Sequence, residues 1–180
     1  MKLKPILRTL LILTVLITNI SCDRISKNIV RHTIADYEQI NVIGNYLTLT
    51  KVENTGAFLS LGHSLPKPVK MLLLTIFPVV VLTLALLYLV TNRTLTNTTM
   101  VGISFMIGGG IGNIYDRLVV GSVTDFLHMD FVIFQTGIFN LADVSIMVGE
   151  CILLMEILRG KRLIVSPVNE KKGEDNPFVN

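Results

Sequence analysis

An apolar run without a single charged residue extends from Met71 to Val90 and limits the folds open to this chain. Its 20 residues are about the number that an α-helix needs to cross the hydrocarbon core of a bilayer. The composition agrees, because 51% of the residues are hydrophobic and 16% are charged, against roughly 25% charged in soluble domains. The chain is therefore predicted to be a membrane protein, and low hydrophobicity, the signature of disorder, is absent from most of it.

Three further segments can span a membrane, although each is less apolar than the first. Residues 94–115 are uncharged but rich in glycine. The run at 9–22 spans if the helix starts near Pro5 and the Arg8 side chain snorkels to the surface. The last segment carries three acids. The sequence thus predicts a mainly α, polytopic membrane protein with four transmembrane helices, at about 5–22, 70–91, 97–115 and 139–158.

Four helices place both ends of the chain on one side of the membrane. Nine basic residues flank the termini and the short 92–96 link, and seven lie in or beside the two longer segments, 23–69 and 116–138. The positive-inside rule then puts both termini in the cytoplasm and the two longer segments outside. Residues 1–165 are expected to form one domain, and the polar residues 166–180 a disordered cytoplasmic tail.

The first outer segment contains a pattern typical of strands. Polar and apolar residues alternate at the end of the stretch 40–49, and Gly44-Asn45 is a candidate hairpin turn within it. A small β-structure outside the membrane is therefore expected.

Several kinds of site are disfavoured by the residue types present. Cys22 and Cys151 are too few for a disulfide scaffold or a Cys-rich zinc site. The three His fit no metal-binding motif, so neither a metal nor a cofactor is expected. Basic residues crowd 159–172, just after the last apolar run, which suits an anionic membrane surface better than nucleic acid. Cys151 is expected to be a packing residue of the last helix.

Ionisable residues close to the predicted helices need an explanation, because a charge at the bilayer centre costs about 2.5–3.5 kcal/mol on insertion scales. Asp23 and Lys27 are four residues apart, in the order that favours a helical ion pair. A structural pair at the end of the first helix is favoured over a direct chemical role. Arg117 follows Asp116 directly, and a structural pair or a clamp for a lipid phosphate both remain open for it.

The glycines before Asp116 superficially suggest a phosphate-binding loop. No strand precedes them, so the context that such a loop requires is missing. Gly108 and Gly112 form a GxxxG pattern, and close packing of helices is the better explanation.

Asp125 and Asp143 are the candidate catalytic pair. The connection between them is long enough to return the chain so that the two carboxyl groups face each other. Two nearby carboxyl groups share a proton, and one can then act as a general base on water while the other acts as a general acid. From spacing alone the simpler alternative is favoured, in which each Asp caps a helix or binds an arginine. Glu150 is expected to turn into the bundle, with no chemistry assigned.

Four separated motifs resemble those of one family, the lipoprotein signal peptidases, also called signal peptidase II. Each motif alone is weak, and all four in this order are specific. With the apolar helices they cover nearly everything from residue 5 to 160. The motifs are Asp23-Arg24-Ile25-Ser26-Lys27, then Glu53-Asn54-Thr55-Gly56-Ala57-Phe58, then the run from Gly108 to Arg117 continuing to Val123-Thr124-Asp125-Phe126, and Phe139-Asn140-Leu141-Ala142-Asp143.

The resemblance implies an aspartyl endopeptidase of the bacterial cytoplasmic membrane, with its active site near the extracytoplasmic face. Such enzymes cut the signal peptide from prolipoproteins just before a diacylglyceryl-modified Cys, in contact with membrane lipids, and are blocked by cyclic peptides of the globomycin kind. It also implies a β-cradle and a short surface helix, which residues 33–66 can provide. The implied dyad is Asp125 and Asp143. The implied substrate-binding or supporting residues are Asp23, Lys27, Asn54, Gly56, Asn113, Asp116, Arg117 and Asn140.

Two positions depart from the family pattern, and three other classes of protein stay open. Arg24 stands where the family commonly has Gln, and Glu150 lies outside the pattern. The chain could instead be a lipoprotein processed at Cys22, although Asn19 is a poor match to the signal required. It could be a small transporter or proton channel that uses its acids as a relay. It could also be a structural subunit whose acids pair for assembly.

Overall fold

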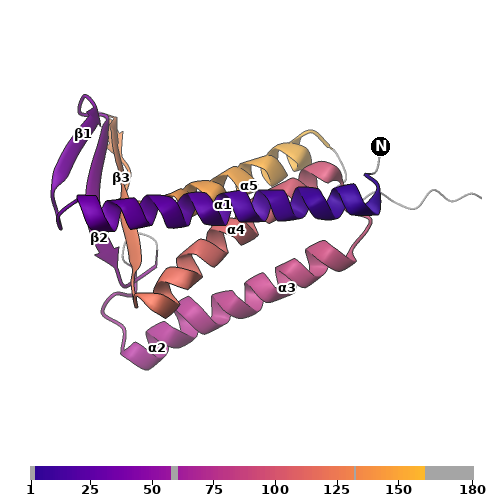
Figure 1. Ribbon diagram of the computed structural model, residues 1–180, viewed down its shortest axis with the longest axis horizontal. Coiled ribbons are helices and arrows are strands. Elements are labelled where there is room, and N and C mark those ends of the chain that lie inside the picture. The colour runs from indigo at the N-terminus through magenta and orange to yellow at the C-terminus, as the bar shows by residue number, and fades with distance from the viewer. Residues whose placement is uncertain (1–2, 58–60, 132, 161–180) are drawn as a thin grey trace, which may run out of the picture.

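The computed structural model describes residues 3–57, 61–131 and 133–160, and it is a helical bundle with a small sheet at one end (Figure 1). The predicted tail, residues 166–180, lies outside the described residues. In chain order the elements are α1 (Pro5–Thr33), β1 (Gln39–Ile43), β2 (Leu47–Asn54), α2 (Lys67–Met71), the π-helical turn η2 (Leu72–Ile76), α3 (Phe77–Thr91), α4 (Asn97–Val119), β3 (Val123–Phe131), β4 (Phe134–Gln135) and α5 (Leu141–Leu158).

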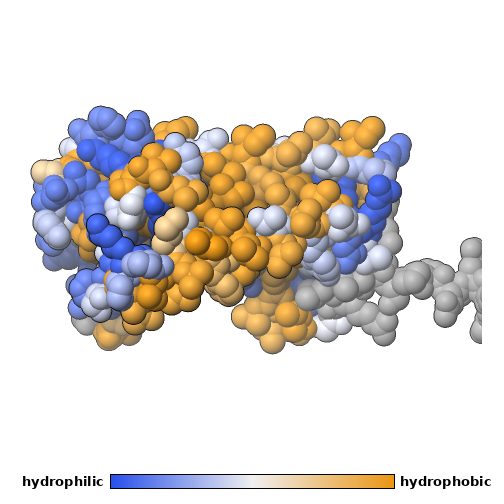
Figure 2. Space-filling view, turned by 90° about the horizontal axis from the view of Figure 1, so that it is seen from below, coloured by the Kyte–Doolittle hydropathy of each residue, from blue (hydrophilic) through white to orange (hydrophobic). Residues whose placement is uncertain are grey.

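The long helices carry the apolar surface of the molecule. Two of them, α1 and the continuous helix from Lys67 to Thr91, are long and apolar enough to cross a membrane. The helices α4 and α5 contain more polar residues, and they share the bundle with these two. The face drawn in Figure 2 shows apolar side chains over the middle of the bundle and polar side chains at both ends. This distribution matches a protein that lies in a bilayer.

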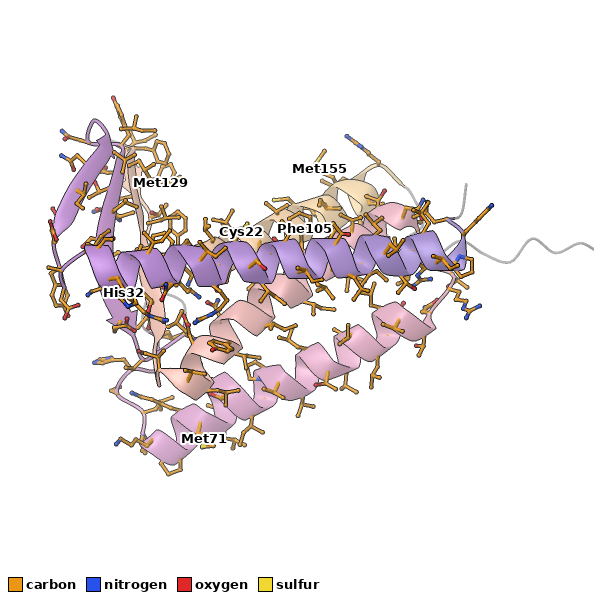
Figure 3. All side chains as sticks on the ribbon, in the orientation of Figure 1. Cys22, His32, Met71, Phe105, Met129 and Met155 are labelled. Atoms are coloured by element: carbon orange, nitrogen blue, oxygen red, sulfur yellow. The ribbon has the colours of Figure 1, made fainter. Side chains whose placement is uncertain are left out.

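The first helix is longer than the span predicted from the charge at Asp23. It continues to Thr33, and Ile34 then takes an extended conformation. Hydropathy places the end of a span at the first charged residue, whereas Asp23 and Lys27 are both buried and pair with each other inside the helix. His32 of α1 and Met71 of α2 mark the end of the bundle at which the sheet lies (Figure 3). The last turns of α1 therefore support the sheet.

The sheet is antiparallel throughout, with the strand order β1-β2-β3-β4. Ile43 pairs with Leu47 across a turn in which Gly44 has a φ of +51°, so the hairpin turn predicted at Gly44-Asn45 is confirmed. The expected short surface helix is not found among the described parts of 33–66 that follow the end of α1. Residues 61–64, between β2 and α2, form turns. Proline at the first turn of α2 favours a helix start there instead.

Glycines of α4 let α1 and α5 approach its backbone. A Cβ atom on Gly108 would lie 2.9 Å from the Asn19 Cβ atom, and one on Gly112 would lie 2.5 Å from the Asp23 carboxylate. On the other side, a Cβ atom on Gly109 would overlap the carbonyl oxygen of Ala142 in α5. The explanation of the glycine pattern by close helix packing is confirmed, and this packing brings the N-terminal end of α5 beside α1 and α4.

Candidate active site

The two candidate catalytic carboxyl groups meet because the chain doubles back after β3. Phe139 exchanges main-chain hydrogen bonds with Leu127 of β3, with N···O distances of 2.8 and 2.9 Å. The helix α5 starts directly after this bridge, with Asn140 as its N-cap. Asp143 in the first turn of α5 therefore lies beside Asp125 of β3, although 17 residues separate them in the chain.

Asparagine side chains hold both carboxyl groups. The Asn140 amide donates to Oδ1 of Asp125 at 2.6 Å, and the Asn54 amide donates to Oδ2 at 2.9 Å. The Asn113 amide donates to Oδ1 of Asp143 at 2.8 Å. Asp143 and Asn140 also form a capping box, since the backbone N–H of each donates to the side chain of the other. Asp143 thus caps the helix α5 and also lies near Asp125. Helix capping and membership of the candidate catalytic pair are therefore compatible for this residue.

Asp125 and Asp143 line one small cavity of about 150 Å³, which we call the dyad pocket. Asp125 is buried and Asp143 is partly exposed. Burial raises the pKa of the Asp125 carboxyl group to about 6, while the hydrogen bonds from Asn54 and Asn140 lower it and the charge of Asp143 raises it. A carboxyl group that holds its proton more strongly than usual, next to a second one, is suited to acid–base chemistry on water. The other residues around the dyad pocket are Asn54, Ala57, Asn113, Arg117, Val123 and Ile138.

Lys27 is fully buried and has three oxygen partners. Its Nζ atom lies 2.9 Å from Asp23 and 3.0 Å from Asp116, and it donates to the Asn113 side chain at 3.0 Å. The ion pair predicted between Asp23 and Lys27 is confirmed. Asp23 also accepts from the Ala142 backbone N–H at 3.1 Å, at the N-terminal end of α5 where negative charge is favourable. The cluster therefore ties α1 to α4 and α5 directly behind the dyad.

Arg117 does not pair with Asp116, because adjacent residues on a helix point in different directions. It donates to the Gly56 carbonyl oxygen at 3.1 Å. The Gly56 backbone N–H donates in turn to the Asn54 side chain at 2.9 Å. These two bonds hold the chain after β2 against the dyad pocket, and Arg117 lines that pocket. Of the two roles left open for Arg117, the pair with Asp116 is wrong.

Sequence reasoning missed Arg31 and the residues that it joins. Arg31 lies 2.9 Å from Asp116 and donates to the Thr124 hydroxyl group at 2.7 Å. Thr124 donates to Glu53 at 2.7 Å, so this group links α1, α4 and the two strands that carry Asn54 and Asp125. Arg31 is four residues beyond Lys27 on the same helical face, and this spacing carries a signal only when the first helix continues past residue 22, as α1 does. Arg24, at the departure from the family pattern, lies 2.6 Å from Asp116 and stacks over the Tyr115 ring.

Two expectations for the last helix are wrong. Glu150 is exposed and does not turn into the bundle, and Cys151 is exposed as well. The buried face of α5 instead includes Gly149, which packs against α4, so the next two residues point away from the core. The buried acid of this helix is Glu156, which accepts from the hydroxyl groups of Thr96 at 2.6 Å and Thr99 at 2.9 Å.

The residues expected at the site on sequence grounds therefore come together in one place. Asp125 and Asp143 share the dyad pocket, and the asparagines hold them. Lys27 with its two acids lies behind the pocket, and Gly56 and Arg117 lie beside it. Within the described residues, no group of three or more His, Cys, Asp or Glu side chains is placed to hold a metal ion.

An apolar helical bundle that holds a pair of aspartates in a small pocket at one end defines a class, that of aspartic peptidases embedded in a membrane. The sequence model of the family described as signal peptidase (SPase) II matches residues 15–159. The chain belongs to this family of aspartic peptidases. Because this is a family of enzymes, the chain is a peptidase rather than a transporter or a structural subunit. The lipoprotein alternative also fails, because α1 runs unbroken through Cys22 and the residues after it build the site.

Named relatives and a solved structure agree with this placement. The chain is 33% identical to a lipoprotein signal peptidase of Solibacter usitatus over 78% of its own length and 85% of the relative's. It is 30% identical to the lipoprotein signal peptidase of Aquifex aeolicus over 90% of its own length and 94% of the relative's. Its fold matches a bacterial membrane enzyme solved by the in meso method at 2.3 Å, with a TM-score of 0.73, 24% identity, and coverage of 92% and 94% of the two chains.

Proposed function

We propose that the protein removes the signal peptide from prolipoproteins just before the diacylglyceryl-modified Cys, with Asp125 and Asp143 as the catalytic dyad. The observation that carries this proposal is the dyad pocket, in which the two carboxyl groups line one cavity and Asn140 bonds to both. The names of the relatives support the choice of substrate. The buried Asp125, whose pKa is raised to about 6, supports the assignment of the proton-holding group.

The proposed reaction needs one proton on the dyad and one water molecule between the two carboxyl groups. Asp143 takes a proton from the water as the oxygen attacks the scissile carbonyl carbon, and Asp125 gives its proton to the carbonyl oxygen. The tetrahedral intermediate then collapses: the C–N bond breaks, the leaving amine takes the proton held by Asp143, and Asp125 takes back a proton from one hydroxyl group of the intermediate, which becomes the carboxyl group of the product. Asn54, Asn113 and Asn140 keep the carboxyl groups in position throughout, which limits the reorganisation that the reaction requires.

The membrane supplies the orientation of the substrate. In this proposal the sheet end of the bundle lies at the extracytoplasmic surface, with both termini in the cytoplasm. The lipid chains of the modified Cys stay in the bilayer and hold the scissile bond at the depth of the dyad pocket, which lowers the entropic part of the barrier. Arg117 lines the pocket and bonds to Gly56, which directly precedes Ala57 in the pocket wall. In this proposal Arg117 and Gly56 contact the substrate near the scissile bond. Cyclic peptides of the globomycin kind are expected to bind at the same place.

The test is cleavage of a diacylglyceryl-modified prolipoprotein by purified protein in detergent, followed as a gel shift. Asp125→Asn and Asp143→Asn proteins are each expected to lose at least about a hundredfold in rate, the usual contribution of general acid–base catalysis. Asp130→Asn is the matched control, since Asp130 is exposed on the same strand as Asp125 and does not line the dyad pocket. Full turnover by folded Asp143→Asn protein would sink the assignment of the dyad.

A further inference from the structure

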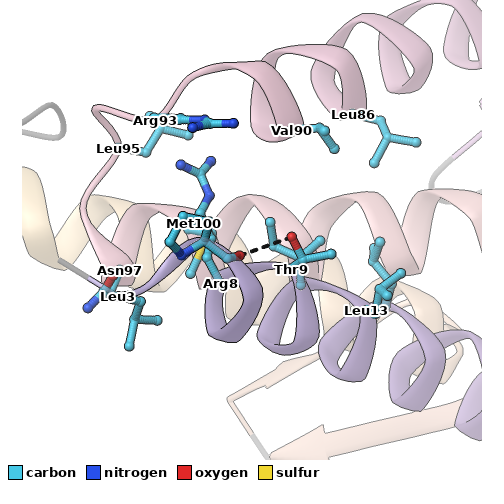
Figure 4. A pocket seen from close by; sticks show the side chains of 13 residues that line it. Leu3, Arg8, Thr9, Leu13, Leu86, Val90, Arg93, Leu95, Asn97 and Met100 are labelled. Atoms are coloured by element: carbon cyan, nitrogen blue, oxygen red, sulfur yellow. Dashed lines mark hydrogen bonds between the residues drawn. The ribbon is translucent and has the colours of Figure 1, made fainter.

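A second cavity lies between α1 and α3, at the end of the bundle opposite the sheet (Figure 4). Its volume of about 660 Å³ falls in the range of roughly 300–1,000 Å³ that small-molecule sites occupy. We call it the arginine pocket, after the two arginines that line it. Most of its wall is apolar and comes from both helices, and it includes Ile12, Leu13, Leu16, Leu86 and Val90. None of these residues takes part in the dyad pocket.

The arginine pocket carries positive charge that no acid in its lining neutralises. Arg8 and Arg93 both line it, and no Asp or Glu does. One terminal nitrogen of Arg8 donates to the carbonyl oxygens of Leu89 at 2.5 Å and Asn92 at 2.8 Å, which fixes its guanidinium group at the C-terminal end of α3. Arg93 is exposed, and its guanidinium group makes no hydrogen bond or ion pair with the part of the chain that the structure describes. In Figure 4 the Arg8 side chain reaches from α1 toward the end of α3, on the side where Arg93 lies.

We propose that the arginine pocket binds one anionic glycerophospholipid from the leaflet at this end of the molecule. The phosphate group lies against Arg8 and Arg93, and one acyl chain follows the apolar wall between α1 and α3. Guanidinium groups match the geometry of phosphate oxygens and bind them strongly. Basic pockets between transmembrane helices are known to suit anionic headgroups. The proposal goes beyond the peptidase function, because it assigns a site at the other end of the bundle.

Charge selects this occupant over the alternatives. A zwitterionic lipid adds a cation that two arginines repel. The leading segment of a signal peptide is basic and is repelled in the same way. The arginines of the pocket suit a group with one net negative charge, and its apolar wall suits a long acyl chain. An anionic glycerophospholipid has both.

The absence of tryptophan from the sequence allows a direct test. Leu13→Trp protein carries one fluorophore in the arginine pocket, and Leu154→Trp protein carries one on the exposed surface of α5. Each is placed in vesicles that contain equal fractions of brominated phosphatidylglycerol or brominated phosphatidylcholine, which quench tryptophan on contact. Leu13→Trp is expected to be quenched more strongly by the phosphatidylglycerol, and Leu154→Trp equally by both lipids.

A second substitution in the Leu13→Trp protein tests the arginines. Arg93→Gln is expected to reduce the preference for phosphatidylglycerol about fivefold, the usual effect of one basic residue at an anionic surface. Arg159→Gln is the matched control, because it removes the same charge from an exposed residue near the same end that does not line the pocket. The preference is expected to persist in this control.

Four results would overturn the proposal. Equal quenching by the two lipids would remove the selectivity, and equal loss in Arg93→Gln and Arg159→Gln would reduce it to general surface charge. Displacement of the lipid by millimolar inorganic phosphate would assign the pocket to a soluble anion. A preference that arises only after deletion of residues 161–180 would show that the chain's own tail fills the pocket. Prolipoprotein cleavage is measured separately, so failure here leaves the dyad assignment intact.

Discussion

At the scale of single residues, the site depends on amide groups as much as on acids. Asp125 is buried, and each of its two oxygens accepts a hydrogen bond from an asparagine. These bonds favour the ionised carboxylate, whereas burial favours the protonated acid, and burial prevails in raising the pKa to about 6. The asparagines therefore lower the pKa of Asp125 from the value that burial alone would give, and in the proposed mechanism they make its proton easier to release.

The pH dependence of kcat/KM tests this balance. Asp125 must be protonated to act as the acid, so activity is expected to fall as the pH rises through about 6, the pKa of that group. Asn54→Leu removes a hydrogen bond to the ionised form, which raises the pKa further, so the falling limb should move to higher pH. A limb that moves to lower pH, or one unchanged in Asn54→Leu, contradicts the role of Asp125. The rate of prolipoprotein cleavage between pH 4 and 9 is the measurement.

Lys27 offers a second test at this scale. Lys27→Met leaves Asp23 and Asp116 buried beside each other without their shared cation. Removal of one partner from a buried ion pair costs about 3–5 kcal/mol, so the protein is expected to unfold at a much lower temperature. Arg24→Gln is the milder comparison, because Arg24 is partly exposed and Asp116 keeps Lys27 and Arg31. Circular dichroism during heating in detergent measures both, and similar melting temperatures would disprove the central role of Lys27.

At the scale of elements, the helix α4 organises the bundle through its glycines. One side of α4 receives Asn19 and Asp23 of α1, and the other receives the start of α5 at Ala142. Because α5 starts one residue after Asn140, the distance between α4 and α5 also sets the distance between Asn113 and Asp143. A change in helix packing is therefore transmitted to the dyad.

Two neighbouring glycines of α4, Gly109 and Gly110, differ in what an added methyl group would contact: backbone in one case and a flexible side chain in the other. A methyl group on Gly109 meets the Ala142 backbone, which cannot move without α5, whereas one on Gly110 meets the end of the Leu82 side chain. Gly109→Ala is expected to destabilise the protein by about 1–3 kcal/mol, the usual cost of overpacking, and to lower the cleavage rate. Gly110→Ala is expected to do much less, because Leu82 can change its rotamer. Melting temperature and cleavage rate are compared, and equal effects would refute this account of α4.

At the scale of the whole molecule, the sheet lies at one end of the bundle, and the start of α1 and the end of α5 lie at the other (Figure 1). Between these two ends, the helices carry a band of apolar side chains (Figure 2). Since the dyad lies where the sheet meets the helices, its side of the membrane decides which compartment supplies the substrate. The proposed arrangement places the sheet outside the cell membrane and the termini inside.

Single-cysteine labelling checks that arrangement. In protein with Cys22→Ser and Cys151→Ser, Asn45→Cys lies in the exposed hairpin turn and Arg159→Cys lies at the exposed end of α5. A membrane-impermeant maleimide added to intact spheroplasts is expected to label residue 45 at once and residue 159 only after permeabilisation. The reverse order would place the dyad in the cytoplasm and overturn the proposed topology.

Four features could be predicted from the amino-acid sequence alone: the membrane class, the approximate positions of the helices, the hairpin turn and, through the four motifs, the family. These features depend on local composition, on short-range pattern and on residue identity, all of which are readable along the chain. The pair Asp23 and Lys27 was predictable for the same reason, because both partners lie on one helical turn.

Which acids are buried, exposed or paired could not be predicted before the fold was known. The neighbourhood of Asp125 and Asp143 depends on the bridge between Leu127 and Phe139, and the role of Arg31 depends on the extension of α1 past Asp23. Glu150 is exposed and Glu156 is buried, although both look alike in the sequence. The physical reason is that the cost of a buried charge depends on its partners, and those partners come from elements far apart in the chain.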